Sequence, residues 1–219
     1  MVAVESVAGY AAPAWQPHRR TSTLVASGCI VAVSVALFAF LLRGGGMNGA
    51  HYAAELVQRI AALVFVVAFV AGPLARLYPT PLTTTLGREQ RGLMLAFAAV
   101  YGVFMASLVA PYLLSGTPLP VATAALCAFS GFILAVLLAC TYDVSGRFLG
   151  PQACRGLQTL AGGYFWLAFA LGDLDRLAGP HRPDSYYGLA LFLLIAALLV
   201  RFADSFVQRR KFQQAEKVN

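Results

Sequence analysis

The chain has 219 residues, of which 59% are apolar and only 11% are charged. Soluble domains carry about 25% charged residues, so this composition predicts an integral membrane protein and argues against a soluble globular one. The formal net charge of +7 does not require a nucleic-acid partner, because basic residues gathered on one side of a membrane bundle explain it.

Six apolar stretches are long enough to cross a bilayer, which takes about 20 helical residues each. They lie near 22–42, 57–74, 92–114, 120–141, 157–173 and 186–203. The sequence therefore predicts an all-α, six-transmembrane-helix bundle over 22–203, with an N-terminal tail (1–21) and a basic C-terminal tail (204–219). No soluble module remains that could hold a flavin or a nucleotide.

The basic residues are distributed unevenly over the two sides of this bundle. The side of both termini and of the second and fourth loops carries Arg19, Arg20, Arg76, Arg88, Arg91, Arg147, Arg155, Arg201, Arg209, Arg210, Lys211 and Lys217. The other side carries Arg43, Arg59, Arg176 and Arg182. The positive-inside rule then predicts that both termini are cytoplasmic.

The second and third predicted spans flank a basic turn. A short amphipathic stretch, 51–58, leads into the second span, and the apolar run ends at Gly72-Pro73. Pro73 removes a helix donor, and Pro79 and Pro81 oppose simple continuation of the helix. We therefore expect two membrane helices joined by a short basic turn.

Small residues recur every four positions in the third and fourth predicted spans. Such a row lies on one helix face and lets two backbones approach closely. The connection between the two spans is short, so we expect them to be antiparallel neighbours that pack directly on each other. The residues that would form this contact are Ala98, Gly102, Ala106, Cys127, Gly131 and Ala135.

The fifth predicted span is the least hydrophobic, because it contains Gln158, Thr159 and a Gly162-Gly163 pair. We expect its neighbours to shield it from lipid. The loop that follows is the best candidate for an external docking surface for a partner. The candidate residues there are Asp173, Asp175, Arg176, His181 and Arg182.

Two groups of short motifs occur in the same order as in a known family. The first group is Pro73-Leu74-Ala75-Arg76-Leu77, then 86–93 (LGREQRGL), then Phe97 to Tyr101; the second is 138–141 (LACT), 147–150 (RFLG) and 155–158 (RGLQ). Over roughly residues 50–203 the chain resembles the ferric-reductase-like transmembrane domain. The likeness is to the small bacterial branch that includes the membrane haem subunit of periplasmic methionine sulfoxide reductase. The resemblance implies a multi-pass protein of the bacterial inner membrane.

The resemblance also implies a b-type haem between the third and fifth helices, held by histidines. In this chain the corresponding positions are Met105, Gln158 and, near the end of the fifth span, Leu171. A bis-imidazole site needs one histidine on each face of the ring. The three histidines of the chain, His18, His51 and His181, all lie outside the predicted apolar spans. We therefore expect no haem and no other resident cofactor.

Three functions remain open. The first, which we favour, is a haem-free accessory or structural subunit of a larger membrane complex, without catalytic activity of its own. Its partners would be the lipid bilayer and other membrane subunits, not nucleic acid. The second is a transmembrane electron-transfer subunit whose b-type haem is held unusually or shared with a partner chain. The third is a membrane protein that binds a quinone, lipid or pigment among Tyr101, Phe104, Tyr164, Phe165 and Trp166.

Overall fold

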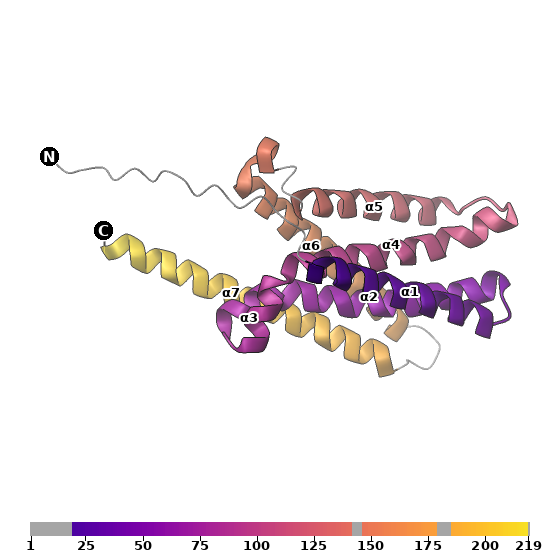
Figure 1. The fold of residues 1–219 in the computed structure, drawn as a ribbon, viewed down its shortest axis with the longest axis horizontal. Helices are drawn as coiled ribbons and strands as arrows, with labels where there is room; N and C mark the ends of the chain where they lie inside the picture. The colour runs from indigo at the N-terminus through magenta and orange to yellow at the C-terminus, as the bar shows by residue number, and fades with distance from the viewer. Residues whose placement is uncertain (1–18, 142–145, 179–184, 219) are drawn as a thin grey trace.

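The computed structural model describes residues 19–141, 146–178 and 185–218, and every regular element in these ranges is an α-helix. The helices are α1 (Arg19–Leu42), α2 (Gly46–Leu77), α3 (Pro81–Arg88), α4 (Gln90–Ser115), α5 (Val121–Thr141), α6 (Gly146–Ala178) and α7 (Ser185–Val218). Six long helices form an elongated bundle, and the short α3 lies at one end of it (Figure 1).

Five helical segments in the described ranges are long and apolar enough to cross a membrane. They are Thr23–Leu42, Gly46–Leu77, Gln90–Leu113, Val121–Thr141 and Ser185–Arg210. This confirms an all-α, multi-pass membrane protein. The predicted fifth span, 157–173, lies within α6, whose polar residues keep it out of this set. The count of six spans therefore stays a prediction.

Helix α2 lies at the centre of the bundle and contacts α1, α3, α4 and α7. Its buried positions include Val57, Ala61, Phe65, Ala68 and Gly72. These recur at the spacing of three to four residues that places side chains on one helix face. Small residues dominate this face, so neighbouring helices come close to it, as is usual in membrane bundles.

The predicted limits of this helix are wrong at both ends. Helix α2 begins at Gly46, so His51 lies in its second turn, and it continues through Pro73 to Leu77. Proline removes only its own N–H, and neighbouring helices in a membrane bundle tolerate the gap. The helix stops where the Tyr78 N–H caps the Leu74 carbonyl at 2.9 Å, directly before Pro79.

The predicted basic turn contains a helix, α3, which we did not expect. Thr80 caps it: the Thr83 N–H donates to Thr80 Oγ1 at 3.2 Å, and the Thr80 N–H donates to Thr83 Oγ1 at 2.8 Å. Pro81 occupies the first helical turn, where the missing N–H costs nothing. The available signal in the sequence was a threonine, Thr80, directly before Pro81, because threonine is a favoured N-cap residue and proline a favoured first helical residue.

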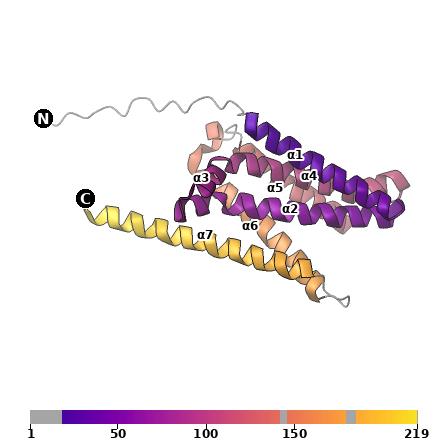
Figure 2. The ribbon, with the colours of Figure 1, turned by 60° about the horizontal axis from the view of Figure 1, so that its bottom comes forward.

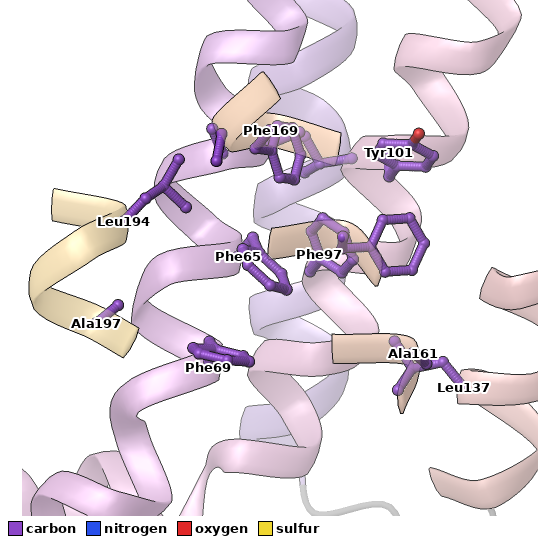
Figure 3. Close-up of a cluster of buried hydrophobic side chains, with 14 of the residues drawn as sticks. Phe65, Phe69, Phe97, Tyr101, Leu137, Ala161, Phe169, Leu194 and Ala197 are labelled. Carbon is purple, nitrogen blue, oxygen red and sulfur yellow. The ribbon is translucent and has the colours of Figure 1, made fainter. Parts of the chain in front are cut away.

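Aromatic rings fill the interior between α2, α4 and α6 (Figure 3). The Phe65 ring centroid lies 5.2 Å from that of Phe97. The Phe165 centroid lies 5.1 Å from Phe97 and 5.0 Å from Tyr101, with the rings edge to face. Phe65, Phe97 and Phe165 are at most 1% exposed. Such ring pairs contribute about 0.5–1.5 kcal/mol each beyond the area that they bury.

The expected close contact between the third and fourth spans, α4 and α5, is wrong at both glycines. A Cβ atom added at Gly102 or Gly131 would meet nothing within 4 Å outside its own helix. Ala106 and Ala135 are exposed, Cys127 is half-buried, and only Ala98 of the six residues is buried. The two helices do touch, but α4 packs mainly against α1 and α2, and α5 mainly against α6. Ser130 of α5, for example, lies 2.6 Å from the Tyr164 hydroxyl of α6.

Helices α6 and α7 each show a feature beyond the membrane spans expected from the sequence. Gly150, with φ 75° and ψ 159°, interrupts the helical path near the start of α6, a conformation that favours glycine. Helix α7 continues to Val218, so the predicted C-terminal tail, 204–219, is helical over its described part. Figures 1 and 2 both show α7 extending past the end of the bundle that carries α3. The predicted N-terminal tail lies outside the described residues except for 19–21.

We predict that Asn48 and Ser185 face the cell exterior and that Thr85, in α3, faces the cytoplasm, because the basic residues gather at the α3 end. Single cysteines would be placed at these sites in a chain whose four native cysteines are alanine, then treated in whole cells with a membrane-impermeant maleimide. Asn48→Cys and Ser185→Cys should be labelled, and Thr85→Cys only after lysis. Labelling of Thr85→Cys in intact cells would contradict this orientation.

A second prediction concerns Gly49. A Cβ atom there would lie 2.7 Å from the Phe40 carbonyl oxygen, so Gly49→Ala must push α1 and α2 apart. We expect it to cost about 1–3 kcal/mol, as overpacking does in other cores. Gly102→Ala is the matched control, since its Cβ meets nothing. Thermal unfolding in detergent should separate the two variants, and equal midpoints would refute the close contact at Gly49.

Candidate functional site: a polar cluster beside an amphipathic groove

A polar cluster joins α2, α6 and α7 at the end of the bundle opposite α3. Its centre is Glu55 and Arg59, which lie one turn apart on α2 and so share a face. The Arg59 Nη2 atom lies 2.8 Å from Glu55 Oε1. Ionisable residues within an apolar helix are costly unless they are paired, and they often mark a functional site.

Tyr187 of α7 connects this pair to the other helices. Its hydroxyl donates to Glu55 Oε1 and accepts from Arg59 Nη2 at 3.3 Å. Arg176 of α6 approaches the same atoms, with its Nη1 3.5 Å from the Tyr187 hydroxyl and 3.6 Å from Glu55 Oε1. Three helices thus converge on one carboxylate oxygen.

Aromatic rings surround the Arg59 guanidinium. Its central carbon lies 4.6 Å from the Tyr186 ring centroid and 5.1 Å from that of Tyr187. The Tyr186 hydroxyl in turn donates to the Arg59 carbonyl oxygen at 3.1 Å. A cation over an aromatic face is stabilised more strongly when water is excluded. Both tyrosines therefore hold this arginine in place.

Asp173, near the end of α6, is 5% exposed. Its Oδ2 atom has no hydrogen-bond partner among the described residues. It borders a cavity of about 10 Å³ that Gln58 and Tyr186 also line. This is room for about one water molecule. Asp173 is therefore part of the interior of the bundle and not of an exposed docking surface.

A larger groove of about 870 Å³ lies beside the cluster, between α2, α4, α5 and α6. One wall is polar: Asn48, His51, Glu55 and Gln58 follow one another at helical spacing on α2, with Arg176 beside them. The facing wall is mostly apolar and consists of Tyr101, Phe104, Leu108, Leu126, Tyr164, Leu167, Ala168, Phe169, Leu171 and Gly172. Ligand sites in proteins have this size and this mixture of apolar walls with a few polar groups.

The three positions that correspond to haem ligands do not gather around this groove. Leu171 lines it and is 55% exposed. Met105 is half-buried against the aromatic core, and Gln158 is half-buried and not part of the groove lining. His51 supplies the one imidazole among the lining residues. In the part of the chain that the structure describes, no group of three or more His, Cys, Asp or Glu residues could hold a metal ion.

The structure places the predicted docking residues in different environments. Asp173 is buried, Asp175 is exposed, and Arg176 belongs to the polar cluster. His181 and Arg182 lie outside the described residues. Sequence reasoning missed the parts that Glu55 and Tyr187 play. A Glu and an Arg four residues apart in an apolar helix were the available signal, but nothing local pointed to Tyr187, 132 residues away.

We predict that Tyr187→Phe destabilises the bundle by about 1 kcal/mol, because it removes the hydroxyl that bonds Glu55 and Arg59 but keeps the ring. Tyr78→Phe is the control, since Tyr78 is 66% exposed. Combining Tyr187→Phe with Glu55→Gln should cost less than the sum of the two single changes, because the two residues share one bond. Strictly additive thermal shifts in detergent would show that the cluster does not act as a unit.

Comparison with protein-family models, with curated proteins and with solved structures finds no match to this chain. The likeness to the ferric-reductase-like domain therefore rests on the sequence motifs alone.

Proposed function

We propose that this chain is a haem-free accessory subunit of a larger complex in the bacterial inner membrane, without catalytic activity of its own. The observation that carries the proposal is the ring-filled interior between α4 and α6, the helices that correspond to the haem-binding pair. Phe97 and Tyr101 of α4 contact Phe165 of α6 at centroid distances of 5.1 and 5.0 Å. A macrocycle could enter this level of the bundle only by displacing these rings, which would cost packing energy.

The side chains at the ligand positions support the same proposal. Leucine has no donor atom, and the Met105 thioether serves as an axial ligand usually opposite a histidine. Met105 instead packs against the core cluster, as methionine commonly does. A bundle with the family's helices but a packed centre is suited to binding other subunits through its outer faces.

A second candidate function is the binding of an amphiphile, such as a quinone, lipid or pigment. The observation that favours it is the groove beside the polar cluster, which includes Tyr101, Phe104 and Tyr164 from the set suggested by the sequence. In this reading the polar α2 wall contacts a head group, and the apolar wall contacts a ring or a chain.

One preparation tests these functions together. The protein would be purified through a C-terminal tag from its native membrane in mild detergent, its co-purifying proteins identified, and its reduced-minus-oxidised spectrum recorded. We expect one or more membrane proteins in fixed ratio to the chain and no b-type alpha band that the chain itself carries. An unrelated tagged membrane protein from the same cells is the control for non-specific co-purification.

A lone, monodisperse protein that carries a small molecule would overturn the accessory-subunit proposal in favour of amphiphile binding. A stoichiometric alpha band in the isolated chain would restore electron transfer. His51→Ala then locates the haem: loss of the band places it in the groove, and survival of the band in both His51→Ala and His181→Ala points to unusual ligation elsewhere.

A further inference from the structure

Arg201 lies within the candidate span Ser185–Arg210 of α7. It precedes Asp204, which forms an ion pair with Arg76 of α2, by about one helical turn. It is half-buried, and its guanidinium carbon lies 4.3 Å from the Phe69 ring centroid. No hydrogen bond among the described residues involves the Arg201 side chain. An arginine at this depth normally pairs with an anion or reaches the interface.

The nearest carboxylate is already occupied. Asp204 accepts from Arg76 Nε at 3.0 Å and from Arg76 Nη2 at 2.6 Å, which is the two-pronged geometry of a strong ion pair. The positive charge of Arg201 is therefore left without a hydrogen-bonded counterion in the described part of the chain. This leaves the donors of its planar guanidinium available to an external anion.

A groove of about 200 Å³ opens beside this side chain, between α6 and α7. Its lining is Phe69, Thr159, Gly163, Leu198, Arg201, Phe202 and Ser205. The space of the groove beside Gly163 is unfilled, because a Cβ atom added there would meet nothing within 4 Å. Of its apolar lining residues on α7, Phe202 is 65% exposed and Leu198 is half-buried. In a membrane protein such a surface faces lipid chains.

Two further arginines extend the faces that form this groove. Arg155 precedes Thr159 by one turn on α6, and Arg209 follows Ser205 by one turn on α7; both arginines are exposed. The hydroxyls of Thr159 and Ser205 already donate to backbone carbonyls, those of Arg155 and Arg201, each at 2.9 Å. The charged donors for an anion in this groove are therefore the arginines. Positive charge at the rim above an apolar trough matches a molecule with an acidic head and a hydrocarbon tail.

We propose that the groove between α6 and α7 binds an anionic phospholipid, whose phosphodiester pairs with Arg201 and whose acyl chain lies along Leu198 and Phe202. Basic pockets between transmembrane helices bind such head groups, and the arginine fork matches two phosphate oxygens. The exposed apolar rim and the absence of a described carboxylate from the groove lining favour a lipid over a protein partner. The site is separate from the groove beside the polar cluster, because the two share no lining residue.

The test uses the purified full-length chain, exchanged into nanodiscs of phosphatidylcholine with one fifth phosphatidylglycerol and then released for native mass spectrometry. The wild type should retain phosphatidylglycerol in preference to phosphatidylcholine. Arg201→Gln should lower retained phosphatidylglycerol about fivefold, the factor that corresponds to about 1 kcal/mol for one basic residue at an anionic surface. Arg88→Gln, an exposed arginine on α3 outside the groove, should retain the wild-type amount.

A second variant keeps the charge and fills the trough. Gly163→Leu should also reduce retained phosphatidylglycerol, whereas Gly156→Leu, at an equally open glycine of α6 outside the groove, should not. Size-exclusion chromatography and circular dichroism confirm that each variant is folded. An equal loss of retained phosphatidylglycerol in Arg201→Gln and Arg88→Gln would show that retention depends on diffuse surface charge and not on the groove. Retention unchanged in both Arg201→Gln and Gly163→Leu, or no lipid preference in the wild type, would overturn the site.

Discussion

The contact of Phe65 with rings from α4 and α6 is the interaction on which the arrangement of the bundle depends. In hydrocarbon, helices gain no hydrophobic driving force by associating, so shape-matched packing and polar bonds must hold them together. Phe65 is 1% exposed and lies 5.2 Å from Phe97 and 6.3 Å from Phe165, centroid to centroid. The rings set the separation of three helices, and with it the width of the groove that Tyr101 and Phe104 line. Truncating Phe65 would leave a void that its rigid neighbours could only partly fill.

Polar bonds tie α2 to α7 at both ends of this packed centre. Near α3 the bond is Arg76 to Asp204, and at the other end it is Tyr187 with Glu55 and Arg59. Apolar helix faces can slide past one another at little cost, whereas two separated sets of directional bonds fit only one register. The polar residues of α2 therefore specify how α7 is placed, while the rings between them supply the packing. Arg201, which lies on the same helix α7, belongs to neither set of bonds.

The long apolar runs were enough to predict the membrane helices, because length and hydropathy are local properties. Pro73 misled the prediction of a helix end, since a single missing donor is tolerated inside a bundle. The rows containing Gly102 and Gly131 failed for another reason: small residues at four-residue spacing occur on open faces as well as at contacts. Tyr187 could not be assigned to Glu55 at all, because the pairing exists only once α2 and α7 lie together. The likeness to a haem-binding family and the missing ligands stay predictions from sequence.

The length of α7 has a consequence for where the end of the chain can reach. Asp204 is the residue through which α7 forms its ion pair with Arg76 of α2, and fourteen more helical residues follow to Val218. At 1.5 Å per residue, this part of the helix extends about 21 Å farther, whereas the head-group layer of one leaflet is only about 5–8 Å deep. The final turns of α7 are therefore long enough to extend beyond the head-group layer. If the bundle tilts, the end of α7 moves sideways by a distance that grows with the length of the helix beyond Asp204. A partner bound to the final turns would therefore be displaced.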